Sequence, residues 1–182
     1  MLSLKSGMIL LIGLYVVLAA VAVGTEPMLP ARVATHFSVS GVPDGWMSRR
    51  AQTISSLGVA AFLVLATSVP LYLARHFSDS TVNLPHREYW LAPERRDATF
   101  AHISGIGVML ACLSLVLMIS LQILVVRANL RTPVRLPASE GFGLIVAFLA
   151  GVGAILFFGF RPFHHLPDTN RLTSAAPPSS LS

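Results

Sequence analysis

The stretch ISGIGVMLACLSLVLMISLQILVV, residues 103–126, decides the fold of this chain. It carries no charged side chain, and a helix of about 20 such residues crosses a hydrocarbon core of about 30 Å. Its apolar residues do not alternate with polar ones, as they would in the strands of a transmembrane barrel. The stretch therefore predicts a transmembrane helix that is long enough to tilt in the bilayer.

Three further apolar blocks, at about residues 7–24, 55–74 and 141–160, are also long enough to cross a membrane. Apolar residues make up 54% of the chain and charged residues only 12%, against roughly 25% charged residues in a soluble domain. The sequence thus predicts an all-α integral membrane protein with four transmembrane helices. The formal charge of +5 comes from Arg residues that flank the blocks, which is typical of contact with lipid headgroups and not of nucleic-acid binding.

The four blocks form one predicted membrane domain, residues 1–160, followed by a tail, residues 161–182, that is rich in Pro and Ser and is expected to be disordered. The loop after the first block, residues 28–49, is rich in turn-forming residues and is expected to be ordered. The first block has an alternative interpretation as a signal peptide, because Lys5 precedes it and Ala20-Val21-Ala22 resembles a cleavage site. Its apolar run is long for a signal peptide, which favours an uncleaved helix.

The fourth block carries small residues at intervals of four, Gly143, Ala147 and Gly151. Small residues at this spacing form a groove that lets a second helix approach closely. The groove is explained either by packing within the monomer or by a contact in a homo-oligomer. In the second block, Pro70 removes one helical hydrogen bond and predicts a kink.

The first loop contains the candidate binding residues. Pro43-Asp44-Gly45 is typical of a tight turn, because proline presets one backbone dihedral and Asp and Gly tolerate the positions that follow. His36 and Trp46 flank this predicted turn. We therefore take His36, Asp44 and Trp46 as candidate ligand-binding residues, with the alternative that they only shape the loop.

The same loop resembles a bacterial family called domain of unknown function 1648. The resemblance rests on Leu29-Pro30, then His36-Phe37, then Gly41-Val42-Pro43-Asp44-Gly45, directly after a first membrane helix. The second loop, residues 83–96, looks like the segment that follows the second helix in many members. The resemblance implies a bacterial inner membrane and an extracytoplasmic first loop, so that both termini are cytoplasmic, and it supplies no catalytic residue.

The same domain also occurs in a family that is similar to the SdpI immunity proteins, which protect bacteria from a secreted toxic peptide and can relay its presence to a repressor. Those proteins have more membrane helices than the four expected here. Lys and Arg are divided almost evenly between the two sides of the membrane, so the positive-inside rule alone gives only a slight preference for a cytoplasmic amino terminus.

The residue types argue against a metal site and against an enzyme. With the second block spanning, His36 lies on the opposite side from the other histidines, which lack a tight ligand spacing. No nucleophile motif or phosphate loop is present. The six histidines are His36, His76, His86, His102, His164 and His165. We expect no cofactor and no bound metal.

The leading hypothesis is a non-enzymatic envelope protein that senses, or protects against, an extracellular peptide or envelope stress. Its expected partners are the lipid bilayer, a peptide or protein at the outer loop, and further copies of itself. The alternative is a small transporter or permease-like subunit, although the apolar cores hold no ionisable group and Gln122 is their strongest polar residue.

Overall fold

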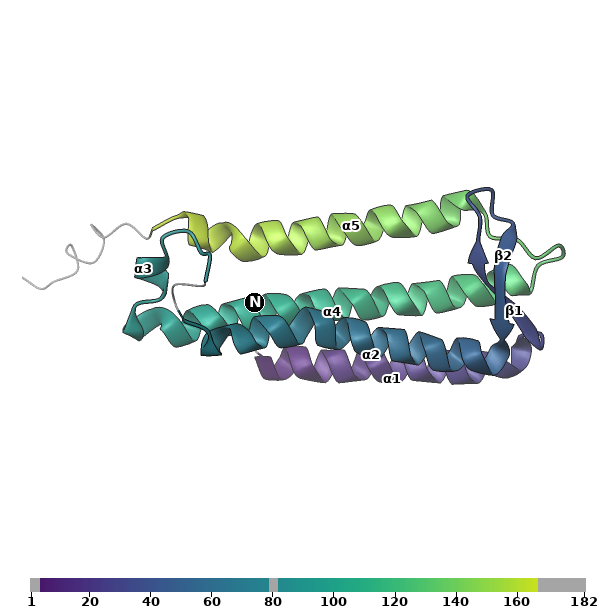
Figure 1. Cartoon of the computed structure of the whole chain (residues 1–182), viewed down its shortest axis with the longest axis horizontal. Helices are drawn as coiled ribbons and strands as arrows, with labels where there is room; N and C mark the ends of the chain where they lie inside the picture. Colours follow the sequence, from purple (N-terminus) through teal and green to yellow (C-terminus); the bar gives the residue numbers. More distant parts are fainter. Residues whose placement is uncertain (1–3, 79–81, 167–182) are drawn as a thin grey trace, which may run out of the picture.

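The computed structural model describes residues 4–78 and 82–166. Four long helices run side by side and a small β-hairpin lies across one end of them (Figure 1). The long helices are α1 (Leu4–Thr25), α2 (Arg49–Leu73), α4 (Pro93–Asn129) and α5 (Ala138–Phe160). The hairpin consists of β1 (Arg32–Phe37) and β2 (Pro43–Ser48). The short elements are the 3-10 helices η1 (Glu26–Met28), η2 (Ala74–His76) and η4 (Arg161–His164), and the helix α3 (Arg87–Trp90).

The four predicted transmembrane helices are confirmed, and the overall class is all-α despite the hairpin. Each long helix is apolar enough and long enough to span a bilayer, so the chain is a multi-pass membrane protein. The helices extend beyond the predicted apolar blocks. The clearest case is α4, whose 37 residues make a helix of about 55 Å at 1.5 Å per residue. Its first turns, with the run Glu94–Asp97, lie outside the apolar stretch, where charge is tolerated.

Three of the long helices, α1, α2 and α4, form a packed bundle. Its centre is an apolar cluster in which Leu18, Ala60 and Leu115 are completely buried. Tyr15 of α1 donates a hydrogen bond to the carbonyl oxygen of Leu57 in α2, at 3.1 Å. Pro70 lies within α2, which runs on to Leu73. Helix α4 is therefore the central element of the fold, with α1 and α2 on one side.

Helix α5 packs on the other side of α4. Gly159 is its only buried residue, and the contact depends on the absence of side chains at two glycines. A Cβ atom at Gly151 would lie 3.0 Å from Leu113 Cδ2, and one at Gly159 would lie 2.9 Å from the side chain of Ile106. At this interface small residues let the two helix backbones approach closely.

The first loop is ordered, but its turn is not where the sequence predicts it. The strands pair antiparallel, with Ala34 opposite Trp46 and His36 opposite Gly45. Pro43, Asp44 and Gly45 lie in β2, so the turn predicted there is wrong. The chain reverses instead between Ser38 and Val42, where Gly41 has a φ of +78° and its N–H donates to the carbonyl of Ser38.

The opposite end of the bundle is closed by aromatic side chains. Phe163 of η4 is buried, and its ring meets those of Trp90 and His102 edge to face. His102 Nε2 lies 2.8 Å from the carbonyl oxygen of Gly159, which ties α4 to the end of α5. The tail predicted to be disordered therefore begins with an ordered segment, residues 161–166. The rest of that prediction, for residues 167–182, lies outside the described residues.

Candidate functional site

The hairpin is hydrogen-bonded to the end of α4 through one side chain. Asn129 is buried, and its Oδ1 accepts a hydrogen bond from the N–H of Ala34 at 2.8 Å. Its Nδ2 donates to the carbonyl oxygen of Ala34, also at 2.8 Å. The amide thus pairs with both backbone groups of Ala34, as a neighbouring strand would. Val33 is fully buried beside Leu29 and Val126, which adds an apolar contact at the same place.

The tip of the hairpin is held to the loop between α4 and α5. The N–H of Leu136 donates to the carbonyl oxygen of Gly41 at 3.1 Å. Arg135 Nη2 donates to the carbonyl oxygen of Ser40 at 3.2 Å. Only glycine fits at position 41, because a Cβ atom there would overlap the backbone carbonyl of Leu136. The hairpin therefore reaches from α1 and α2 to the beginning of α5.

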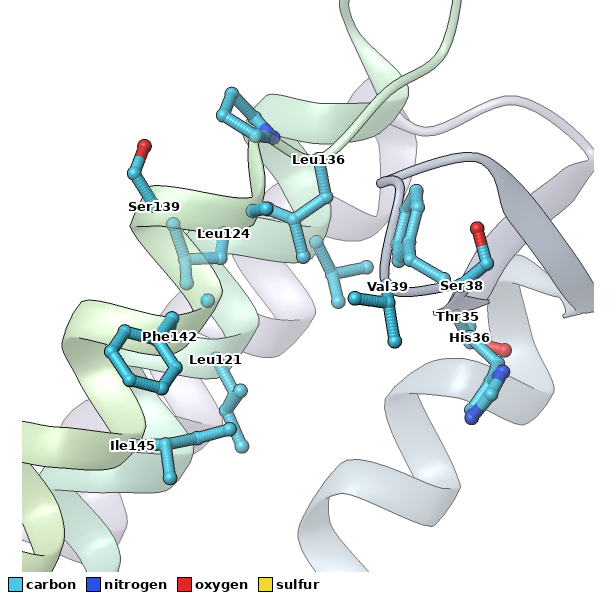
Figure 2. Close-up of a pocket in the computed structure, with 15 residues that line it drawn as sticks. Thr35, His36, Ser38, Val39, Leu121, Leu124, Leu136, Ser139, Phe142 and Ile145 are labelled. Atoms are coloured by element: carbon cyan, nitrogen blue, oxygen red, sulfur yellow. The ribbon is translucent and has the colours of Figure 1, made fainter.

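Below the hairpin, between α4 and α5, lies a cavity of about 720 Å³, which we call the hairpin-end cavity. Figure 2 shows apolar side chains of α4 and α5 on one side and the hairpin residues on the other. The polar groups at its margin are Thr35, His36, Ser38 and Ser139. Its apolar lining is Phe37, Val39, Leu121, Leu124, Val125, Leu136, Pro137, Ala138, Gly141, Phe142 and Ile145. Such a cavity suits a largely apolar ligand with a few polar groups.

The three candidate binding residues all lie on the hairpin. His36 Nδ1 is 2.5 Å from Asp44 Oδ1, and both side chains are well exposed. His36 borders the hairpin-end cavity, whereas Asp44 and Trp46 are not among its lining residues. Trp46 is 44% exposed. The hairpin thus brings His36 and Asp44 together as a surface pair and leaves Trp46 apart from them.

The loop beside the cavity carries a cluster of charges. Glu140, near the start of α5, accepts a hydrogen bond from Arg131 Nη2 at 2.8 Å, and Arg127 Nη2 lies 3.9 Å from the same carboxylate oxygen. Two guanidinium groups against one carboxylate give this cluster a net positive charge, and its Glu140 lies in the chain between Ser139 and Gly141, which line the cavity. The arrangement also holds the start of α5 against the end of α4.

A second polar site lies inside the three-helix bundle. Gln122 of α4 is 2% exposed, and its Oε1 accepts hydrogen bonds from Gln52 Nε2 at 2.8 Å and from Ser56 Oγ at 3.1 Å. Its Nε2 lies 3.4 Å from Thr25 Oγ1. Gln52 Oε1 is buried and has no hydrogen-bond partner among the described residues. The network joins α1, α2 and α4 without any ionised group.

Of the predicted packing residues, the structure brings one into a helix contact. Gly151 faces Leu113 of α4, whereas nothing lies within 4 Å of a Cβ atom placed at Gly143. Ala147 is exposed and borders a small hollow of about 100 Å³ between α4 and α5.

Sequence reasoning missed Asn129 and Gln52. The available signal was their position, since each lies close to an end of an apolar block. There a side-chain amide can form hydrogen bonds either with the backbone at the helix end or with a neighbouring element. Within residues 4–78 and 82–166, no three His, Cys, Asp or Glu side chains lie close enough together to hold a metal ion.

Residues 10–62 of the chain match the family described as Domain of unknown function (DUF1648). The match covers most of α1, the whole hairpin and the first half of α2, and it ends before α4 and α5. No curated protein and no solved structure matches the chain.

Proposed function

Starting from the membership of residues 10–62 in the family of domain of unknown function 1648, we propose that the protein is a non-enzymatic receptor in a bacterial plasma membrane. It binds an apolar or amphipathic peptide in the hairpin-end cavity, and so protects the cell against that peptide or senses it. Its hairpin faces outward, both termini are cytoplasmic, and its role is of the kind served by the SdpI-like immunity proteins.

The observation that carries the proposal is that one cavity is shared by the hairpin, α4 and α5. An occupant would touch all three at once. The hairpin is already tied to α4 through Asn129 and to the α4–α5 loop through Gly41 and Leu136. A ligand that pushes α5 away would therefore also strain the contact at the hairpin tip. The strain would transmit the binding event from the cavity to the hairpin.

The chemistry of the cavity supports a peptide more than a small polar solute. Its lining is mainly apolar, while hydroxyl groups and His36 stand at its margin. The charge cluster of Arg127, Arg131 and Glu140 is positive overall, and the neighbours of Glu140 in the chain line the cavity. A peptide with an apolar segment and an acidic group or a free carboxyl end fits this arrangement.

Site-specific photo-crosslinking tests the binding site. Benzoylphenylalanine replaces Phe142, which lines the cavity, or Phe157, which is similarly exposed but lies near the far end of α5. Cells are grown to high density in their own medium and irradiated. We expect a peptide adduct at position 142 and none at position 157. The same adducts at both positions would contradict a specific site.

A growth assay tests the protective role. A deletion strain is challenged with medium from a dense culture of the parent strain and complemented with variants of the gene. Ile145→Trp fills the cavity and is expected to abolish protection at normal protein level. Leu149→Trp, one turn away and outside the cavity lining, is expected to protect fully. Equal protection by both variants would reject the cavity as the protective site.

A reporter fusion tests the orientation. An enzyme that is active only in the cytoplasm should work when fused after Ser182. It should fail when inserted at Val39, which is 96% exposed at the hairpin tip. The opposite result would reverse the orientation.

The second candidate function is a small transporter or permease-like subunit, and the polar network in the bundle supports it. Gln52 Oε1 is buried without a described partner, and such a group can contact a passing polar solute. Protein in liposomes should then conduct a solute, with flux lost in Gln52→Leu. The absence of flux for a panel of amino acids, ions and sugars would reject this function and leave the network as a packing device.

A further inference from the structure

The hairpin has one protected edge and one open edge. On β1, both backbone groups of Ala34 are bonded to Asn129 of α4. In an antiparallel pair, the N–H and C=O of one residue point to the same side, and the side alternates along the strand. Ala34 therefore turns its backbone groups away from β2, and its pairing with Trp46 is of the type without hydrogen bonds between the two residues.

It follows that Trp46 turns its own N–H and C=O away from β1. The hydrogen bond from the N–H of Arg49 to the carbonyl of Ala31 fits this alternation, since it places the odd-numbered residues of β2 towards β1. The N–H of Ser48 then points outward with the groups of Trp46. Among the described residues, nothing is bonded to these three backbone groups.

Proteins commonly block an open edge with proline, lysine or a bulge. Here the outward-facing positions of β2 after Asp44 are Trp46 and Ser48, so neither proline nor lysine blocks them. Asp44 is the extra residue in the irregular pairing between His36 and Phe37, so it ends the regular edge on that side. The remaining open edge is short, and at Trp46 and Ser48 no proline, lysine or bulge blocks it.

We propose that two copies of this chain pair through the open edges of β2, antiparallel and centred on Trp46. In this register, the two Trp46 residues exchange N–H···O=C hydrogen bonds. Each Ser48 then lies opposite Asp44 of the other copy and donates its N–H to that strand. The result is a four-stranded sheet that crosses the end of a dimer. This inference is independent of the proposed peptide binding.

The charge pattern indicates that the partner at the open edge of β2 is a second copy of this chain. Each β2 has Asp44 near its start and leads into Arg49 and Arg50 at its end. Antiparallel pairing puts the carboxylate of one copy near the guanidinium groups of the other, on both sides of the twofold axis. The attraction between Asp44 and the arginines therefore occurs twice in one interface.

The orientation of the hairpin allows this pairing within one membrane. The strands lie across the end of the helices and not along them (Figure 1). Met47 faces the bundle, since its sulfur accepts a hydrogen bond from Ser55 Oγ in α2, whereas Asp44, Trp46 and Ser48 are exposed. A twofold axis parallel to the helices then makes the two strands antiparallel and keeps both exposed faces on the same side.

Cysteine crosslinking in liposomes tests the register. In a Cys112→Ala background, Trp46→Cys is compared with Val39→Cys, which is also exposed on the hairpin but lies at its tip. With a short thiol-to-thiol crosslinker, we expect at least a fivefold higher yield of dimer for Trp46→Cys. Equal yields would overturn the proposal, and so would adducts of Trp46→Cys with a different protein in cells but none with itself.

Removal of one backbone donor is the second test. Trp46→Pro deletes an N–H that points away from β1, so the hairpin keeps its internal bonds while the dimer loses two. Trp46→Phe keeps the N–H and is the matched control. Counting of photobleaching steps should show mainly monomers for Trp46→Pro and dimers for Trp46→Phe. A dimer fraction unchanged in Trp46→Pro would overturn the pairing, and if that variant does not accumulate, the crosslinking yields decide.

Discussion

The two sides of α4 are packed in different ways. Towards α1 and α2, α4 buries large side chains such as Leu115 and a hydrogen-bonded network around Gln122. Towards α5, the contact uses two glycines along the helix, and within α5 only Gly159 is buried. Polar contacts fasten the two ends of α5, through Glu140 at its start and through His102 at its end. The difference indicates a densely packed three-helix bundle and a fourth helix that is packed loosely along its middle. The hairpin-end cavity lies between the two parts.

The largest expected effect is in the three-helix bundle. Leu115→Ala should lower the free energy of unfolding by about 2–5 kcal/mol, because it leaves a cavity among packed side chains. Leu149→Ala, on the exposed side of α5, is the control and should change it by less than about 0.5 kcal/mol. The measurement is unfolding by SDS in mixed micelles, followed by Trp fluorescence. Similar losses for the two variants would remove the distinction between the two sides of α4.

The next largest effect concerns the link between α4 and the hairpin. Asn129→Ala leaves the buried N–H and C=O of Ala34 without partners, which costs about 1–3 kcal/mol. We expect the hairpin to open while the helices stay folded, so trypsin should cut at Arg32 and Arg49 many times faster. Ser120→Ala removes an exposed hydroxyl that bonds only within α4, and it should leave the digestion rate unchanged. Unaltered digestion in Asn129→Ala would show that apolar contacts alone hold the hairpin.

A smaller loss is expected for the polar network. Gln122→Leu deprives Gln52 and Ser56 of their shared acceptor, and interhelical hydrogen bonds in membranes contribute about 0.6–1.7 kcal/mol each. We expect a total loss of about 1–2 kcal/mol in the same unfolding measurement. Ser114→Ala is the control, since that buried hydroxyl bonds to Leu110 of its own helix. A gain in stability for Gln122→Leu would favour a role in function over a role in packing.

The sequence predicted the three-helix bundle better than the hairpin. Apolar blocks identify membrane spans because lipid imposes one requirement along a whole segment. They do not show where a helix ends in water, which is why α4 begins ten residues before its predicted block at residue 103. The extension carries charged residues that a search for apolar stretches excludes.

The turn of the hairpin was predicted at the wrong position because proline and glycine occur both in turns and in strands. Gly41 forms the turn, with its positive φ. Gly45 is in a strand, where a Cβ atom would lie 2.7 Å from the Cβ of His36 opposite. The close approach of two strands leaves no local signal in the sequence. The hydrogen bonds of Asn129 also leave no local signal, because its partner Ala34 is 95 residues away. The sequence did identify His36 and Asp44 as candidate residues of one loop, and the hairpin brings their side chains together.

The smallest expected effect is that of Gly143→Leu in α5, where substitutions at two glycines separate two kinds of contact. A Leu side chain at Gly151 meets Leu113 of α4, so Gly151→Leu should displace α5 and cost about 1–3 kcal/mol at most. At Gly143, no heavy atom of the described residues lies within 4 Å of an added Cβ atom. Gly143→Leu should therefore be neutral, or stabilising by up to about 1 kcal/mol, because glycine is unfavourable inside a helix. Gly153→Leu is the matched control, since that position is also open.

The measurement is protein accumulation in the membrane together with the dimer fraction. If Gly143→Leu lowers the dimer fraction while Gly153→Leu does not, then Gly143 faces a second copy, and the loosely packed side of the molecule is an interface. If neither variant has an effect, that face of α5 contacts lipid, and only its contact with α4 depends on small residues.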